Sequence, residues 1–251
     1  MTKIEWLDRF LRVRKCAACG EIIAWSPDPG AFCEECRKQW EYAKIENCST
    51  CFQSAIDCTC MPKLLSDSGA LCLRKLFFYH PERYKEVSNR LVYFIKRHQT
   101  YRVFCHLAKD WMPQLAEELQ TLGIENKAEE CLLVSLPRGW TARSHYGFDQ
   151  SDRLCRALSD VTGIPYLSLI RRKMGGVEQK KLKQRERLRN MKRRLILRKK
   201  RLEKSGVELS KRTVILVDDL VTTGTTMAAA ISILRRAGVR RVICLSIAKT
   251  E

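Results

Sequence analysis

The sequence lacks any long hydrophobic run. Its longest apolar stretches, such as residues 131–136 and 214–217, have the length of strands, whereas a membrane-spanning helix needs about 20 apolar residues in succession. The first residues also lack the separate basic and apolar regions of a secretory signal, because charged residues alternate there with Trp6, Leu7 and Phe10. These absences argue against a membrane helix and predict a cytoplasmic protein.

Acidic residues are scarce. The 251 residues include 28 Asp and Glu against 47 Lys and Arg, which gives a formal net charge of +19. Most of this excess lies in residues 171–212, where 19 basic residues face 4 acidic ones. Such a balance favours a polyanionic partner. We expect residues 171–212 to form a basic, flexible loop.

Cysteine is concentrated near the N-terminus, where eight of the 13 fall within residues 1–60. These eight form two groups of closely spaced pairs. Two thiolates so spaced can converge on one ion, and two pairs complete the closed tetrahedral shell of a structural Zn²⁺. The candidate metal ligands are Cys16, Cys19, Cys33 and Cys36 in the first group and Cys48, Cys51, Cys58 and Cys60 in the second.

The cysteine groups have alternative interpretations. A disulfide framework would use the same residues, although thiols stay reduced in the cytosol, which favours zinc. In the second group the final pair has only one residue between its cysteines, so His80 or Cys72 remains an alternative ligand. The five later cysteines lie among apolar neighbours, and we expect them to be small buried side chains.

Strand-like and helix-like segments alternate through the rest of the chain, which predicts an α/β fold with a parallel sheet flanked by helices. We expect a cysteine-rich zinc-binding module over residues 1–62 and a larger domain over residues 70–251. Strands are predicted within residues 71–111 as a short pair, and at 131–136, 166–170, 213–217 and 241–247. Helices are predicted at 81–97, 115–122, 225–237 and up to residue 161, where Asp149 or Ser151 caps the start and Gly163 stops the helix.

Residues 214–226 carry the strongest chemical signal. Four apolar residues are followed by Asp218 and Asp219, and then by a hydroxyl-rich loop around Gly224 that opens a helix. Adjacent carboxylates at the end of a parallel strand can accept hydrogen bonds from a vicinal diol, while amides at a helix N-terminus can hold a phosphate. The pattern predicts a site for a sugar phosphate.

This stretch resembles the thirteen-residue signature of type I phosphoribosyltransferases, which bind 5-phosphoribosyl-1-pyrophosphate (PRPP). The resemblance implies that Asp218 and Asp219 hold the ribose hydroxyls and act as the catalytic pair. It implies a 5′-phosphate site made by Thr222, Thr223, Gly224, Thr225 and Thr226. Mg²⁺ would accompany PRPP, and Arg138 or Arg187 would contact the pyrophosphate.

Further segments resemble the ComF family. They are the N-terminal cysteine pairs, Pro137 with residues 147–150, and the spaced residues Gln179, Leu182, Arg187 and Asn190. This resemblance implies a zinc module joined to a phosphoribosyltransferase-like domain that acts in natural competence, DNA uptake and transformation. Single-stranded DNA and a competence helicase are the partners it implies.

Two other functions fit the same residues. One is an active phosphoribosyltransferase, a glycosyltransferase of nucleotide or cofactor salvage, although the Asp that purine-salvage members often carry is replaced here by Thr222. The other is a PRPP-sensing regulator, in which the ligand changes the affinity for nucleic acid or a protein. The sequence leaves these alternatives open.

Overall fold

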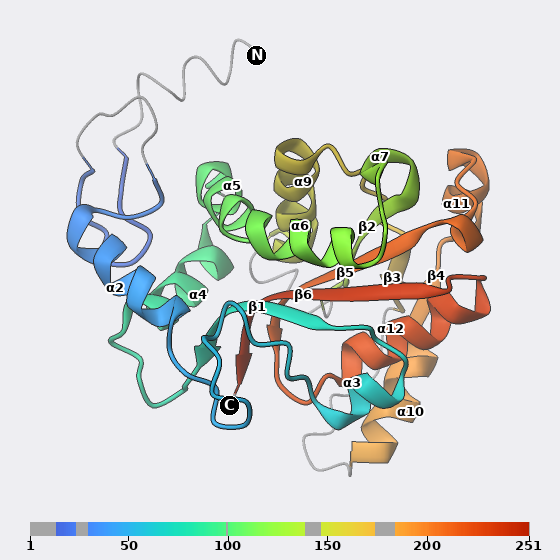
Figure 1. Cartoon of the computed structure of the whole chain (residues 1–251), viewed down its shortest axis with the longest axis horizontal. Helices are drawn as coiled ribbons and strands as arrows, with labels where there is room; N and C mark the ends of the chain where they lie inside the picture. Colours follow the sequence, from blue (N-terminus) through green and yellow to red (C-terminus); the bar gives the residue numbers. More distant parts are fainter. Residues whose placement is uncertain (1–13, 24–29, 99, 139–146, 174–183, 251) are drawn as a thin grey trace.

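A four-stranded parallel sheet lies at the centre of the computed structural model (Figure 1). The structure describes residues 14–23, 30–98, 100–138, 147–173 and 184–250. The strand order is β1-β6-β5-β2, with β1 at Leu73–Tyr79, β6 at Arg241–Thr250, β5 at Thr213–Val221 and β2 at Cys131–Ser135. The predicted α/β fold class is therefore confirmed.

The sheet is buried on both faces, because successive side chains of a strand point to opposite sides. In β5, Ile215 and Val217 join one apolar cluster, while Val214 and Leu216 join another on the opposite face. This explains why residues 214–217 are continuously apolar.

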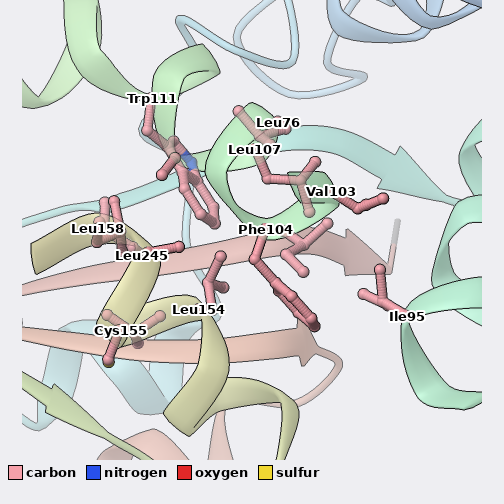
Figure 2. Close-up of a cluster of buried hydrophobic side chains, with 14 of the residues drawn as sticks. Leu76, Ile95, Val103, Phe104, Leu107, Trp111, Leu154, Cys155, Leu158 and Leu245 are labelled. Carbon is pink, nitrogen blue, oxygen red and sulfur yellow. The ribbon is translucent and has the colours of Figure 1, made fainter. Parts of the chain in front are cut away.

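Helices cover both faces of the sheet. α5, α6 and α9 lie on one side of the sheet, and α3, α10 and α12 lie on the other (Figure 1). Figure 2 shows buried side chains of the core between these helices, among them Phe104 and Leu107 of α5 and Leu154 and Leu158 of α9. The bounds are α3 Lys63–Asp67, α5 Tyr101–Asp110, α6 Met112–Thr121, α9 Gln150–Thr162, α10 Gln184–Arg194 and α12 Thr225–Arg236.

The cysteine-rich part shares its core with the sheet domain. Trp40, on α2 (Glu34–Lys44), is fully buried and packs edge-on against Phe77 of β1 at 5.4 Å between ring centroids. The Trp40 indole N–H also donates to Asp110 Oδ2 at 2.7 Å. The domain boundary at residues 62–70 stays a prediction, but the hydrophobic core is continuous across it.

Several expected elements differ in the structure. Residues 71–111 hold one strand, β1, followed by α4 (Val87–Arg97) and α5, because β1 pairs with the distant β6 rather than with a hairpin partner. The predicted strand at 166–170 is reduced to an isolated bridge at Tyr166 and the start of β3, Ile170–Arg172. The predicted strand at 213–217 is longer, since β5 runs through both aspartates to Val221.

The described part of the basic segment contains regular structure. β3 pairs antiparallel with β4, and α10 packs against α12. Residues 174–183 lie outside the described residues. The further elements of the fold are β4 Leu195–Leu197, α11 Lys199–Ser205, a 3-10 turn at Leu209–Lys211 and α7 Lys127–Glu130.

The described helices are too short or too polar to span a membrane. None of them combines the length and the apolar character that crossing a bilayer demands.

Candidate functional site

Two adjacent carboxylates lie near the end of β5. Asp218 Oδ1 accepts hydrogen bonds from the backbone N–H of Asp219 at 2.9 Å and from Ser151 Oγ at 3.3 Å. Asp219 forms an ion pair with the Arg138 guanidinium, and its Oδ1 accepts from the backbone N–H of Leu220 at 3.0 Å. The structure therefore brings the predicted acid pair and Arg138 together.

The two aspartates differ in electrostatic environment. Burial raises the pKa of Asp218 well above its ordinary value, and repulsion from Asp219 adds to the shift. Asp219 has the cationic Arg138 as its partner. A ligand that donates hydrogen bonds to both carboxylates would relieve the unfavourable burial of Asp218.

The hydroxyl-rich residues 222–226, here called the phosphate loop, follow directly. Gly224 adopts a left-handed φ of 71° and precedes α12, and its carbonyl accepts the first helical bond, from Ala228 N–H at 2.9 Å. The first N–H groups of a helix have no intrahelical acceptor. Thr223 and Thr225 join their hydroxyls across the turn at 2.8 Å. Amides and hydroxyls thus converge about five residues after the acid pair, as an anion site requires.

The sequence analysis did not identify Ser151 and Asp149 as site residues. Asp149 caps α9 by accepting from Ser151 N–H at 3.1 Å, as its predicted capping role implies. Its other oxygen accepts from Arg138 N–H at 3.1 Å, and burial raises its pKa. An Asp and a Ser at the start of a predicted helix could have indicated these residues. The same pattern, however, is typical of an ordinary helix cap, so it does not identify a functional site.

Arg187 lies exposed on α10, a helix packed against α12. Arg138, the other candidate, touches Asp219 directly. Pyrophosphate contact by Arg187 stays a prediction.

The first cysteine cluster comprises Cys16, Cys19, Cys33 and Cys36, whose sulfur atoms all lie within 4.8 Å of one another. Cys19 Sγ and Cys33 Sγ are 3.7 Å apart. A tetrahedral Zn²⁺ with bonds of about 2.3 Å separates its sulfur ligands by about 3.8 Å, so the spacing fits such an ion. All 13 cysteines are free thiols in the structure, so the disulfide alternative is not formed.

The second cysteine cluster comprises Cys48, Cys51, Cys58 and Cys60 and meets the same distance limit. Cys51 and Cys58 lie 3.5 Å apart, which also suits a metal shell. The alternative ligands lie elsewhere, since Cys72 is buried in the main core and His80 contacts Glu46 at 3.1 Å. Both clusters could therefore hold a metal ion.

Backbone amides favour the thiolate form of one cysteine in each cluster, while burial raises the pKa of Cys19 in the first cluster and of Cys60 in the second. Burial opposes ionisation of Cys16, but hydrogen bonds from backbone N–H groups, including that of Ala18, outweigh it and lower its pKa to about 7. The same balance, with Thr50 N–H as one donor, lowers the pKa of Cys48 to about 6. Metal binding requires thiolates, so these amides suit a metal-thiolate site.

A lysine that the sequence analysis did not identify as a site residue contacts the second cysteine cluster. Lys75 of β1 is fully buried, and its ammonium donates to the Cys58 carbonyl at 2.6 Å. It also lies 5.4 Å from the centre of the Phe78 ring, which packs on Cys48 and Cys58. Its ammonium therefore lies beside the second cysteine cluster, at Cys58.

Comparison with known proteins agrees with this geometry. Residues 165–250, which contain the acid pair and the phosphate loop, match the family described as the phosphoribosyl transferase domain. No match was found among curated proteins. The chain thus carries a phosphoribosyltransferase-like domain.

Three solved structures similar to the chain are enzymes. An allosteric regulatory enzyme of purine biosynthesis is 20% identical, with a TM-score of 0.36 over 59% of this chain and 26% of its own. Hypoxanthine phosphoribosyltransferase from Staphylococcus aureus is 14% identical, with a TM-score of 0.32 over 57% and 61%. A variant of hypoxanthine phosphoribosyltransferase from Trypanosoma cruzi, complexed with IMP, is 16% identical, with a TM-score of 0.35 over 63% and 73%. The chain thus spans about a quarter of the first enzyme and less than two thirds of the second.

Proposed function

We propose that this protein binds PRPP and transfers its phosphoribosyl group to an acceptor. The observation that carries the proposal is the placement of Asp218 and Asp219 on the strand that leads into the phosphate loop. The carboxylates are acceptors for the ribose 2′ and 3′ hydroxyls, and the loop amides and threonine hydroxyls are donors for the 5′-phosphate.

The proposed chemistry follows from this arrangement. Departure of pyrophosphate leaves an oxocarbenium-like ribose, whose positive charge the two carboxylates stabilise electrostatically. Arg138 pairs with Asp219 in the free protein, and we expect its guanidinium to turn toward the pyrophosphate once the ribose occupies Asp219. Mg²⁺ bound with PRPP would neutralise charge on the leaving pyrophosphate.

Calorimetric titration of PRPP with Mg²⁺ tests the binding step. The wild type should bind, and a variant with Asp218→Asn and Asp219→Asn should not. Pyrophosphate release with a panel of nucleobases then tests transfer. Absence of PRPP binding by the wild type would contradict the proposal, while binding without turnover on any acceptor would favour a PRPP-sensing regulator.

We also propose that both cysteine clusters hold structural Zn²⁺. Four thiolates leave no open coordination position, so these ions would staple the N-terminal region rather than take part in catalysis. Metal analysis of the purified protein should give two zinc ions per chain. A value near zero, in protein purified without chelators, would contradict this assignment.

A role in natural competence, with single-stranded DNA as a ligand, is the second candidate function. It is supported by the resemblance to the ComF family and by the exposed cations of α10 and α11. A competence helicase, as protein partner, and a cytoplasmic location rest on the resemblance and the sequence alone. Among the side chains that the structure describes, the exposed cations of these two helices are Arg187, Arg189, Lys192, Arg193, Lys199, Lys200, Arg201 and Lys204.

Binding of fluorescent single-stranded DNA, followed by anisotropy at several salt concentrations, tests this candidate. Affinity should fall steeply with salt, because contacts to phosphates release counterions. A variant with Lys199→Glu and Lys200→Glu should bind more weakly, while Arg37→Glu with Lys38→Glu on α2, an equally exposed pair, serves as the matched control. Equal loss in both variants would contradict a specific DNA surface on α11.

A further inference from the structure

The second cysteine cluster lies next to the phosphate loop through a short stretch of chain. Cys60, its last member, is followed at once by Met61, which packs against the apolar cluster that contains Val221 and Met227. These two residues flank the phosphate loop on either side. Cys60 is thus one residue away from a side chain that packs against the same apolar cluster as the residues flanking the phosphate loop.

Residues 62–65, which follow Met61, lie beside the phosphate loop. A Cβ atom built on Gly224 would lie 3.4 Å from Leu65 Cβ and 3.5 Å from Pro62 Cβ and Cγ. Leu65 is fully buried, and α3 packs against α12. The turn at Gly224 therefore lies beside residues 62–65, at the predicted domain boundary.

The other side of the second cysteine cluster is anchored to the sheet. Lys75 of β1 donates to the Cys58 carbonyl at 2.6 Å, and Arg74 donates to the Asp57 carbonyl at 2.8 Å. A metal ion that joins Cys58 and Cys60 to the other two thiolates would therefore tie residues 60–65 to β1. Without the ion, Cys58 and Cys60 are no longer joined to the other two cysteines through a metal. Residues 62–65, which lie beside the phosphate loop, are then held less firmly to β1.

We infer that a metal ion in the second cysteine cluster positions the phosphate loop, so that this ion and a phosphoribosyl ligand strengthen each other's binding. The inference rests on the proposed PRPP-binding function. Coupling between two sites is reciprocal, so PRPP must raise the affinity of the second cysteine cluster for its metal by the same factor. The first cysteine cluster packs in the core on the opposite face of the sheet and should show no such coupling.

Substitution of Pro62 tests the mechanical link without touching a metal ligand. Pro62→Gly removes the ring that contacts Gly224, and Pro81→Gly removes an exposed proline from a turn elsewhere. Both variants should retain two metal ions. Calorimetry with PRPP and Mg²⁺ should show affinity about tenfold weaker for Pro62→Gly, within the range of measured couplings, and unchanged for Pro81→Gly.

The affinity for the metal tests the reverse direction. In a variant with Cys33→Ser and Cys36→Ser, only the second cysteine cluster can hold a full metal shell. In equilibrium competition with a chromogenic chelator, its affinity for zinc should be about tenfold higher with saturating PRPP and Mg²⁺ than with Mg²⁺ alone. The complementary variant, Cys58→Ser with Cys60→Ser, leaves only the first cluster, whose affinity for zinc should not respond to PRPP.

The outcomes separate the two proposals. If the wild type does not bind PRPP, the proposed function is wrong and the inference falls with it. If the wild type binds PRPP, but Pro62→Gly binds as well as Pro81→Gly and PRPP leaves the affinity for zinc unchanged, the phosphoribosyl site stands and the coupling is refuted.

Discussion

The same substitution at two adjacent positions should change stability in opposite directions. Asp218→Asn should raise the free energy of unfolding, because burial and the neighbouring Asp219 make its negative charge unfavourable. Asp219→Asn should lower it, because the Arg138 guanidinium loses its charged partner. Both changes should weaken PRPP binding, since each removes a carboxylate from the proposed diol site.

The magnitudes follow from the two environments. Each unit by which the pKa of Asp218 in the folded state exceeds its unfolded value costs about 1.4 kcal/mol at neutral pH. The side chains of Arg138 and Asp219 are only 13% and 11% exposed. Breaking such a pair on one side costs about 3 kcal/mol, at the lower end of the range for buried pairs. For a chain of this size each kcal/mol moves the melting temperature by about 2 to 4 °C.

Thermal unfolding of the free proteins between pH 4 and pH 8 measures both effects. The raised pKa of Asp218 means that its cost is absent below the unfolded pKa and grows as the pH rises toward the folded pKa. The advantage of Asp218→Asn should therefore be largest at pH 8 and shrink toward pH 4. A lower melting temperature for Asp218→Asn at pH 8, or an advantage that does not change with pH, would refute this reasoning.

Three further predictions concern other parts of the molecule. Gly224→Ala should cost about 1 kcal/mol or more in thermal unfolding, because the residue has a left-handed φ of 71°, and should weaken PRPP binding in calorimetry. Lys75→Met should speed zinc release to a chromogenic chelator, because the buried cation that donates to the Cys58 carbonyl is lost. Lys75→Arg keeps the positive charge and should increase the rate of zinc release less. Trp40→Phe should cost about 1.5 to 3 kcal/mol in denaturant unfolding, because Asp110 loses the indole donor at 2.7 Å, and no change would refute that role.

Local patterns in the sequence predicted much of the sheet domain. The apolar run at 214–217, the Asp149 cap and the glycine stop at Gly163 all indicate elements that the structure contains. The errors concern pairing between distant segments. Periodicity could not show that β1 pairs with β6, about 170 residues later, so the segment at 71–111 was interpreted as a local strand pair.

The candidate site was predictable where its residues are consecutive. Asp218, Asp219 and the phosphate loop form one stretch of sequence, as do the close cysteine pairs. Three other residues reach their partners only through the tertiary fold: Ser151, Asp149 and Lys75. Nothing in the sequence around them marks them as site residues rather than as ordinary helix or strand residues. The segment at 62–67 was similarly interpreted as the end of a module, because its contact with Gly224 depends on the tertiary fold.

Discrimination between two sugar phosphates tests the central claim most directly. Ribose 5-phosphate and 2-deoxyribose 5-phosphate differ by one hydroxyl, which the acid pair at Asp218 and Asp219 is proposed to bind. A hydrogen bond to a charged acceptor contributes about 1.5 to 3 kcal/mol, so the deoxy sugar should displace PRPP at least about tenfold less effectively. Equal displacement by the two sugars would contradict recognition of the ribose diol by these carboxylates.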